Sequence, residues 1–195
     1  MEKIISDIRD LIVNPVQTFE RLNAEETTRS QLTKSMLLYL AAIPAVAGFI
    51  GRVIIGHSVP FVGYYHVPFF PGLLWSILMF VLGVAIVYLI AFIINGLIGS
   101  FGGERNELNA FKLSLYSFMP LFVLGVFSLI PALMGLFILG LYGIYLFYVG
   151  SPILMRCPEE KALPFTVVVS LIAILITVLF YRVAQLAIAN SMPNF

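Results

Sequence analysis

The fold is decided by residues 113–155, which read LSLYSFMPLFVLGVFSLIPALMGLFILGLYGIYLFYVGSPILM. The stretch contains no Asp, Glu, Lys, Arg or His. A helix crosses the hydrocarbon core of a membrane in roughly 20 residues, so the stretch is long enough for two crossings. Proline breaks the helical ladder, and a turn is expected at Ser128–Pro131. Because lipid offers the backbone no hydrogen bonds, the stretch is predicted to be a helical hairpin within a membrane.

The composition of the whole chain agrees with this prediction. Of its 195 residues, 61% are hydrophobic and 11% charged, and the mean hydropathy is +1.03. A soluble domain carries about 25% charged residues. The net charge of +1 gives no reason to expect a nucleic-acid partner. Cys157 is the single cysteine, which excludes an intrachain disulfide, and charged residues interrupt the first thirteen positions, where no secretory signal peptide is expected.

The sequence predicts an all-α, polytopic integral membrane protein with five transmembrane helices and an N-terminal amphipathic interfacial helix. We divide it into a cytoplasmic N-terminal segment (1–32), a five-helix transmembrane domain (33–188) and a short tail (189–195). The expected spans are residues 33–55, 72–98, 108–130, 132–155 and 163–186. Three prolines and several aromatic residues within 57–72 predict a loop at the membrane–water interface.

The amphipathic helix is expected over residues 3–13. Ile4, Ile8, Leu11 and Ile12 fall on one face, with Ile5 at its edge. Such a helix can lie in the membrane interface and anchor the N-terminus. The alternative is that it senses or shapes the membrane, or docks a partner.

The distribution of charge predicts the orientation. With the N-terminus inside, every basic residue except Arg52 and Arg182 lies on the cytoplasmic side, which the positive-inside rule favours. All ten acidic residues fall on the same side. Five spans then place the C-terminus on the outer side.

No constellation of residues predicts catalysis or metal binding. His57 and His66 are the only imidazole bases, and both lie on the expected outer loop, far from Cys157 and from every carboxylate. Nucleophilic catalysis needs a nucleophile beside a base, and a metal site needs several converging ligands. We therefore expect no enzyme activity and no catalytic, cofactor-binding or metal-binding residue.

Polar residues inside the spans allow two interpretations. The span cores contain no Asp or Glu, the groups that coupled carriers place within the bilayer. Hydroxyl and amide side chains there bond between helices. The alternative is a channel or facilitator for a small solute or ion, with a pathway among spans two to four near Asn95, Ser114 and Tyr116.

The most patterned segment is GLYGIYLFYVGSP, residues 140–152. Small glycines let a neighbouring helix approach closely, and buried tyrosine hydroxyls need partners. We interpret the segment as a packing surface; the alternative is a binding surface for lipid or another membrane protein. The candidate packing and partner residues in this region are Pro120, Pro131, Gly140, Tyr142, Gly143, Tyr145, Gly150 and Pro152.

Five segments together resemble a known family. They are NPVQTFERL (14–22), LLYLAAIPAVAGFIG (37–51), YSFMPLFVLGVFSLIP (116–131), GLYGIYLFYVGSPILM (140–155) and EEKALPF (159–165). The chain resembles the Yip family, the Ypt/Rab-GTPase-interacting membrane proteins, and within it the bacterial inner-membrane branch.

The resemblance implies a five-helix membrane domain with a cytosolic N-terminus, located in the cell inner membrane. In eukaryotes the family is associated with secretory traffic, Rab-type GTPases, hetero-oligomers and membrane shape. The short N-terminal segment here lacks the eukaryotic DLYGP-type motif, so no residue is assigned as a GTPase contact. The function we expect is helix-mediated association with lipid, with a second copy or with other membrane proteins, as a membrane organiser or adaptor.

Overall fold

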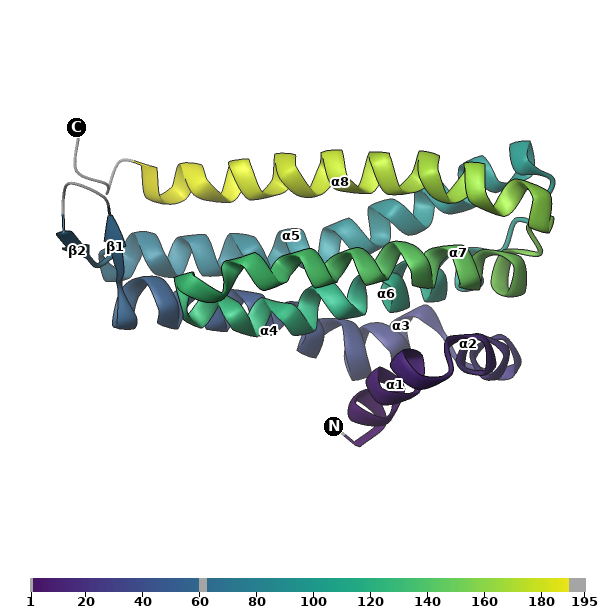
Figure 1. Ribbon diagram of the computed structural model, residues 1–195, viewed down its shortest axis with the longest axis horizontal. Coiled ribbons are helices and arrows are strands. Elements are labelled where there is room, and N and C mark those ends of the chain that lie inside the picture. Colours follow the sequence, from purple (N-terminus) through teal and green to yellow (C-terminus); the bar gives the residue numbers. More distant parts are fainter. Residues whose placement is uncertain (1, 60–62, 190–195) are drawn as a thin grey trace.

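The computed structural model describes residues 2–59 and 63–189 (Figure 1). The predicted fold class is confirmed: within these residues the chain is helical apart from one short hairpin. Five of the helices are long and apolar enough to cross a membrane. These spans are Arg29–Ile55, Phe69–Phe101, Glu107–Leu129, Gly135–Met155 and Glu159–Leu186.

The spans are built from shorter elements, preceded by two N-terminal helices, α1 (Glu2–Val13) and α2 (Pro15–Ala24). The first span joins α3 (Arg29–Leu32), the π-helix η1 (Thr33–Leu37), α4 (Leu38–Phe49) and the π-helix η2 (Ile50–Ile55). Then follow β1 (His57–Val59), β2 (Gly63–Tyr65), α5 (Phe69–Leu97) and the 3₁₀ helix η3 (Ile98–Phe101). The remaining elements are α6 (Glu107–Leu124), the 3₁₀ helices η4 (Gly125–Leu129) and η5 (Pro131–Leu141), α7 (Tyr142–Met155) and α8 (Glu159–Ala189).

The spanning helices run alongside one another in a single bundle (Figure 1). We call the end with the connections 102–106 and 156–158 the charged end, and the end with β1 and β2 the hairpin end. The helices α1 and α2 lie against the side of the bundle toward the charged end (Figure 1). The loop expected over 57–72 thus contains an antiparallel hairpin, in which His57 pairs with Tyr65.

The core is formed around α5, which packs against α4, α6 and α8. Val87, Ile90 and Ile94 of α5 are at most 1% exposed. In contrast, α8 presents aliphatic side chains outward, with Leu171 63% and Leu175 70% exposed. A helix with apolar residues all round suits a bilayer, where the outward face meets lipid.

The long apolar stretch turns as the sequence predicts, at Ile130 between η4 and η5, where the backbone is extended. The returning segment differs from the expected α-helix because residues Pro131–Leu141 form a 3₁₀ helix before α7 begins at Tyr142. Proline at the first helical position lacks an N–H donor, and Gly135 and Gly140 are weak helix formers.

Glycine brings α6 and α7 together. A methyl group added at Gly143 would collide with the backbone carbonyl oxygen of Ser117. Gly125 makes a similar approach to Pro44, which joins the end of α6 to α4. Because a membrane supplies no hydrophobic force between helices, such close backbone contacts are a main source of association between them.

The inward face of α1 differs from the expected one at one position. Ile4 and Ile8 pack against the core and Leu11 is 2% exposed, as the pattern predicts. However, Ile12 is 64% exposed, so it does not share their face. The reason is that α1 ends at Val13 and the chain turns into α2 at Asn14, so Leu11 alone of the last turn meets the bundle.

Candidate functional site

The α1–α2 pair lies in a seat formed by α6 and α7, and buried apolar side chains provide most of the contact. Phe19 and Leu22 of α2 are at most 1% exposed. A methyl group at Gly150 of α7 would lie 2.9 Å from the Phe19 ring, so the glycine leaves the space that Phe19 fills. Burying a side chain of this size is worth about 1.5–3 kcal/mol.

A lysine joins the end of α2 to α6. The Nζ atom of Lys112 donates hydrogen bonds to the carbonyl oxygens of Leu22 (2.5 Å) and Glu25 (2.9 Å). The last carbonyls of a helix lack partners within it and carry partial negative charge, so a cation there is favourable. Lys112 is 1% exposed. Its side chain is thus buried between α6 and α2.

A buried carboxylate joins α1 to the bundle. Asp7 is 0% exposed, and its Oδ2 atom accepts a hydrogen bond from the Tyr116 hydroxyl (3.0 Å). Its Oδ1 atom accepts one from Arg21 of α2 (2.7 Å). Buried charges occur in proteins when they are paired and hydrogen-bonded, and removing one partner costs about 3–5 kcal/mol. Asp7 therefore couples α1, α2 and α6 through one side chain.

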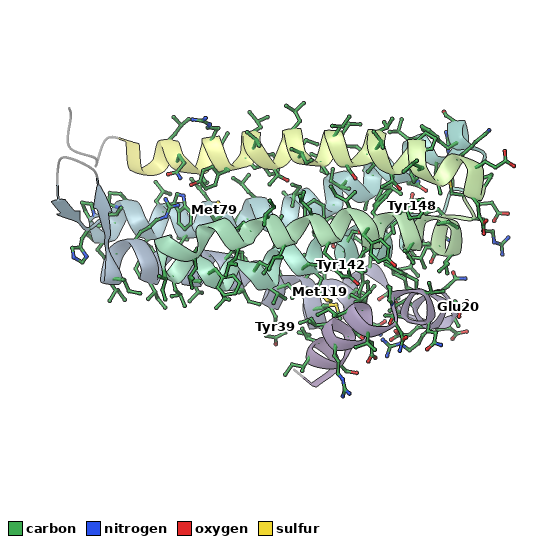
Figure 2. All side chains as sticks on the ribbon, viewed as in Figure 1. Glu20, Tyr39, Met79, Met119, Tyr142 and Tyr148 are labelled. Atoms are coloured by element: carbon green, nitrogen blue, oxygen red, sulfur yellow. The ribbon has the colours of Figure 1, made fainter. Side chains whose placement is uncertain are left out.

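Three further hydrogen bonds complete the seat. The Tyr142 hydroxyl donates to the carbonyl oxygen of Leu11 (2.9 Å), at the end of α1. Figure 2 places Tyr142 where the bundle meets the N-terminal helices. The Asn109 side-chain amide donates to the Leu154 carbonyl oxygen (2.9 Å) and to Asn23 (3.2 Å). An open polar hollow of about 640 Å³ lies beside these groups.

The candidate packing residues divide between the inside and the outside of the bundle. Gly143 and Gly150 are buried against α6 and α2, and a methyl group at Gly140 would lie 2.9 Å from Leu121. Tyr142 bonds to α1, whereas Tyr145 is 48% exposed and stacks on Tyr142, with 5.5 Å between ring centroids. The three prolines lie within or at the start of helices: Pro120 in α6, Pro131 at the beginning of η5 and Pro152 in α7.

The candidate pathway residues are not brought to one cavity. Ser114 donates its hydroxyl to the Val87 carbonyl oxygen (2.8 Å) and lines a cavity of about 220 Å³. Tyr116 instead faces Asp7. The side-chain oxygen of Asn95 is buried and has no hydrogen-bond partner among the described residues. The cavity lies between α6, α7 and α8, and its other polar lining residues are Ser117, Ser170 and Thr177.

The groups considered for chemistry are held apart. Cys157 is 3% exposed, and burial raises the pKa of its thiol, although nearby Lys161 opposes the shift. The thiol therefore stays protonated at neutral pH and is a poor nucleophile. A ring nitrogen of His66 lies 3.3 Å from the Val53 carbonyl oxygen, and the His57 side chain lies outside the described residues. Within the described ranges no three His, Cys, Asp or Glu side chains could hold a metal ion.

Sequence reasoning missed Asp7, Arg21 and Lys112 as the groups that hold the N-terminal helices. One signal was present: Lys112 stands within AFKLSLY, where a lone charge interrupts apolar residues near the start of the third span. A charge in such a place needs a partner. No pattern identified the α2 carbonyls as that partner, because they come from a helix ninety residues earlier.

Comparisons with known proteins agree with this architecture. The family model for the Yip1 domain matches residues 9–181. This range includes α2, the parts of α6 and α7 that form its seat, and the spans up to the last residues of the fifth. The inner membrane protein YohC of Escherichia coli K12 is 26% identical over 167 residues, covering 83% of this chain and 85% of the relative. The YohC protein of E. coli O6:H1 strain CFT073 matches to the same extent. No solved structure matches. With five helices able to span a membrane and a family match over nearly its whole length, the chain belongs to the Yip1 domain family of integral membrane proteins.

Proposed function

We propose that the protein is a non-enzymatic membrane organiser or adaptor that associates with a second copy or with other membrane proteins through the outward face of η5 and α7. We further propose that it resides in a cell inner membrane with its N-terminus in the cytoplasm. The positive-inside rule supports this orientation, and the similarity to inner membrane proteins of E. coli supports this membrane.

The observation that carries the proposal is the aromatic surface of α7. Leu141, Tyr145 and Tyr148 line one side of the helix and are 54%, 48% and 41% exposed. Neither tyrosine hydroxyl has a hydrogen-bond partner among the described residues. Tyr145 lies about 15 Å along the helix from Met155, at 1.5 Å per residue. A phenol hydroxyl at that depth in a bilayer is stabilised by a partner that offers an acceptor.

The outward face of α8 supplies the contrast. Its exposed side chains Leu171, Leu175 and Leu179 are aliphatic and need nothing beyond lipid tails. Away from its aromatic face, α7 packs against α2, where the Phe19 ring fills the space at Gly150. A partner on the aromatic face of α7 would therefore meet a helix that its contact with α2 holds in place.

The test is affinity purification from native membranes in mild detergent, with bound proteins identified by mass spectrometry. The double variant Tyr145→Ala/Tyr148→Ala is compared with the wild type and with Leu171→Ala/Leu175→Ala on α8. We expect a stoichiometric protein, or a second copy of the chain, with the wild type and the α8 variant but not with the α7 variant. Equal recovery from all three would contradict the proposed surface.

The cavity beside α8 favours one second function, a facilitator for a small neutral solute. Ser117, Ser170 and Thr177 line it, and the Ser117 hydroxyl is buried without a partner among the described residues. Flux of small neutral solutes into liposomes that contain the purified protein tests this function. Ser117→Leu, which fills the cavity, is expected to abolish such flux, and flux no greater than in empty liposomes removes the facilitator function.

A further inference from the structure

The positively charged side chain of Arg52 lies at the hairpin end of the bundle, where three spans meet. Arg52 of η2 lies over the ring of Trp75 in α5, with its guanidinium carbon 3.9 Å from the ring centroid. Its Nη1 atom donates to Gln185 (3.2 Å) and its Nη2 atom to the Tyr181 hydroxyl (3.4 Å), both on α8. The guanidinium is thus oriented by neutral groups from α5 and α8.

The sequence explains the position of the aromatic ring. A methyl group added at Gly48 would collide with the far edge of the Trp75 indole, so Gly48 forms the notch that receives the ring. Arg52 follows Gly48 by one helical turn and therefore projects over the same ring. Trp75 is 2% exposed, which fixes the plane on which the guanidinium rests.

The hydrogen-bonding capacity of this cluster is not filled. A guanidinium has five N–H donors, and the described residues accept from two of them. The indole N–H of Trp75 is buried and has no acceptor among the described residues. Two neighbouring side chains therefore hold donors that the described part of the chain leaves without acceptors.

Among the described residues, no acidic side chain lies near Arg52 at this end. The acidic residues of the chain belong to residues 2–26, 104–107 and 159–160, on the N-terminal helices or at the charged end. Arg182, exposed on the last turns of α8, adds a second positive charge beside Tyr181. Arg52 stands three residues before the end of the first span, and Tyr181 and Gln185 lie near the end of the fifth. This is the depth at which lipid phosphates border the hydrocarbon core.

We propose that Arg52, held on Trp75 by Tyr181 and Gln185, binds the phosphate group of an anionic phospholipid at the hairpin end. Guanidinium matches phosphate through two parallel hydrogen bonds, and it is more weakly hydrated than an ammonium group. A lipid phosphate supplies a negative charge and acceptors for the guanidinium donors that the described residues leave without partners. The site lies at the opposite end of the bundle from the seat and does not depend on the proposed association through α7.

The test is native mass spectrometry of the purified full-length protein titrated with phosphatidylglycerol, with phosphatidylcholine of the same chains as the reference lipid. We expect preferential binding of phosphatidylglycerol, weakened about tenfold in Arg52→Gln, because one charge-assisted pair is lost. The matched control is Arg105→Gln, which removes the same charge at the other end, where Arg105 donates to the Gly96 carbonyl oxygen (3.5 Å). Equal weakening in both variants, or in neither, would contradict the site.

Further arms separate the sources of phosphate and the effects on folding. Excess inorganic phosphate is expected to leave bound phosphatidylglycerol in place; displacement would assign the site to a free anion and overturn the lipid assignment. Should Arg52→Gln fail to purify as a folded protein, Arg52→Lys decides. Lysine keeps the charge but lacks the planar fork, so affinity is expected to fall a few-fold. Unchanged affinity in Arg52→Lys would contradict recognition by the guanidinium. A variant lacking residues 190–195 is expected to bind the lipid as the wild type does; altered binding would contradict the assignment to Arg52.

Discussion

Asp7 shows how single residues hold this fold together. A carboxylate without water is stable only when cations and donors replace that water, and Arg21 and Tyr116 do so here. Lys112 solves the converse problem, because its ammonium group meets the unpaired carbonyls at the end of α2. The carboxylate belongs to α1 and the ammonium group to α6. The N-terminal helices and the bundle therefore each contribute one of the two buried charges.

The first prediction concerns the Tyr116 hydroxyl. Tyr116→Phe leaves the ring in place and removes a donor from a buried carboxylate, which is expected to lower the free energy of unfolding by about 1.5–3 kcal/mol. The measurement is unfolding by denaturant in detergent. The control is Tyr145→Phe, since that hydroxyl has no partner among the described residues and its loss should change stability by less than about 0.5 kcal/mol. Identical stabilities of the two variants would contradict the role of the Asp7–Tyr116 bond.

Residue-level prediction from the sequence succeeded only in part. The lack of carboxylates in the spans and the apolar face of α1 at Ile4, Ile8 and Leu11 could be read directly. The Asp7–Tyr116 and Lys112–Leu22 bonds could not, because they join residues 109 and 90 positions apart. Local pattern carries no information about which distant backbone carbonyl will satisfy a buried charge.

At the scale of elements, the contact of α6 with α7 is set by glycine. Gly143 lies against the backbone of Ser117, so no larger side chain fits without moving one helix away from the other. Tyr142, next to it, meets α1. Separation of α6 from α7 would therefore also disturb the seat of the N-terminal helices.

The second prediction compares two glycines in helices. Gly143→Ala adds a methyl group against a backbone carbonyl and is expected to destabilise the protein by about 1–3 kcal/mol, the usual cost of overpacking. Gly96→Ala in α5 meets nothing within 4 Å and should be neutral, or stabilising by up to about 1 kcal/mol, because alanine favours a helix. Thermal unfolding of both variants in detergent is the measurement. A Gly143→Ala protein as stable as Gly96→Ala would rule out the close contact.

The elements themselves could be predicted well, because an uninterrupted apolar run of sufficient length has one stable form in lipid. The turn near Pro131 followed from the missing N–H of proline. Two local geometries were not predictable from periodicity. Apolar periodicity did not distinguish the 3₁₀ form of Pro131–Leu141 from an α-helix. The β1–β2 hairpin arises within a segment where prolines only indicated the absence of a helix.

At the scale of the whole molecule, charge and apolar surface are segregated along the bundle. All ten acidic residues belong to the N-terminal segment or to the charged end, which holds the ion pairs Arg29–Glu107 (2.7 Å) and Arg156–Glu104 (2.9 Å). The hairpin end holds Arg52 and Arg182. The two exposed ion pairs at the charged end add little stability, about 0–1 kcal/mol each. The distribution of basic residues between the two ends matters instead for membrane insertion, because basic loops are retained in the cytoplasm.

The third prediction is therefore one of topology. A C-terminal fusion to alkaline phosphatase is expected to be active in bacterial cells, since that enzyme needs the oxidising outer side. A C-terminal green fluorescent protein is expected to be dark, while the same reporter at the N-terminus should fluoresce. The reverse pattern would place the charged end outside and contradict the orientation.

The proposal that α7 carries an association surface depends on what touches that surface in an intact membrane. The most direct measurement is photo-crosslinking in living cells, with a benzophenone amino acid placed at Tyr145, or at Leu175 on α8 as the control; both positions are exposed. The account predicts a discrete protein adduct, from a second copy or from another membrane protein, at Tyr145 and none at Leu175. Adducts to lipid alone at both positions would contradict it.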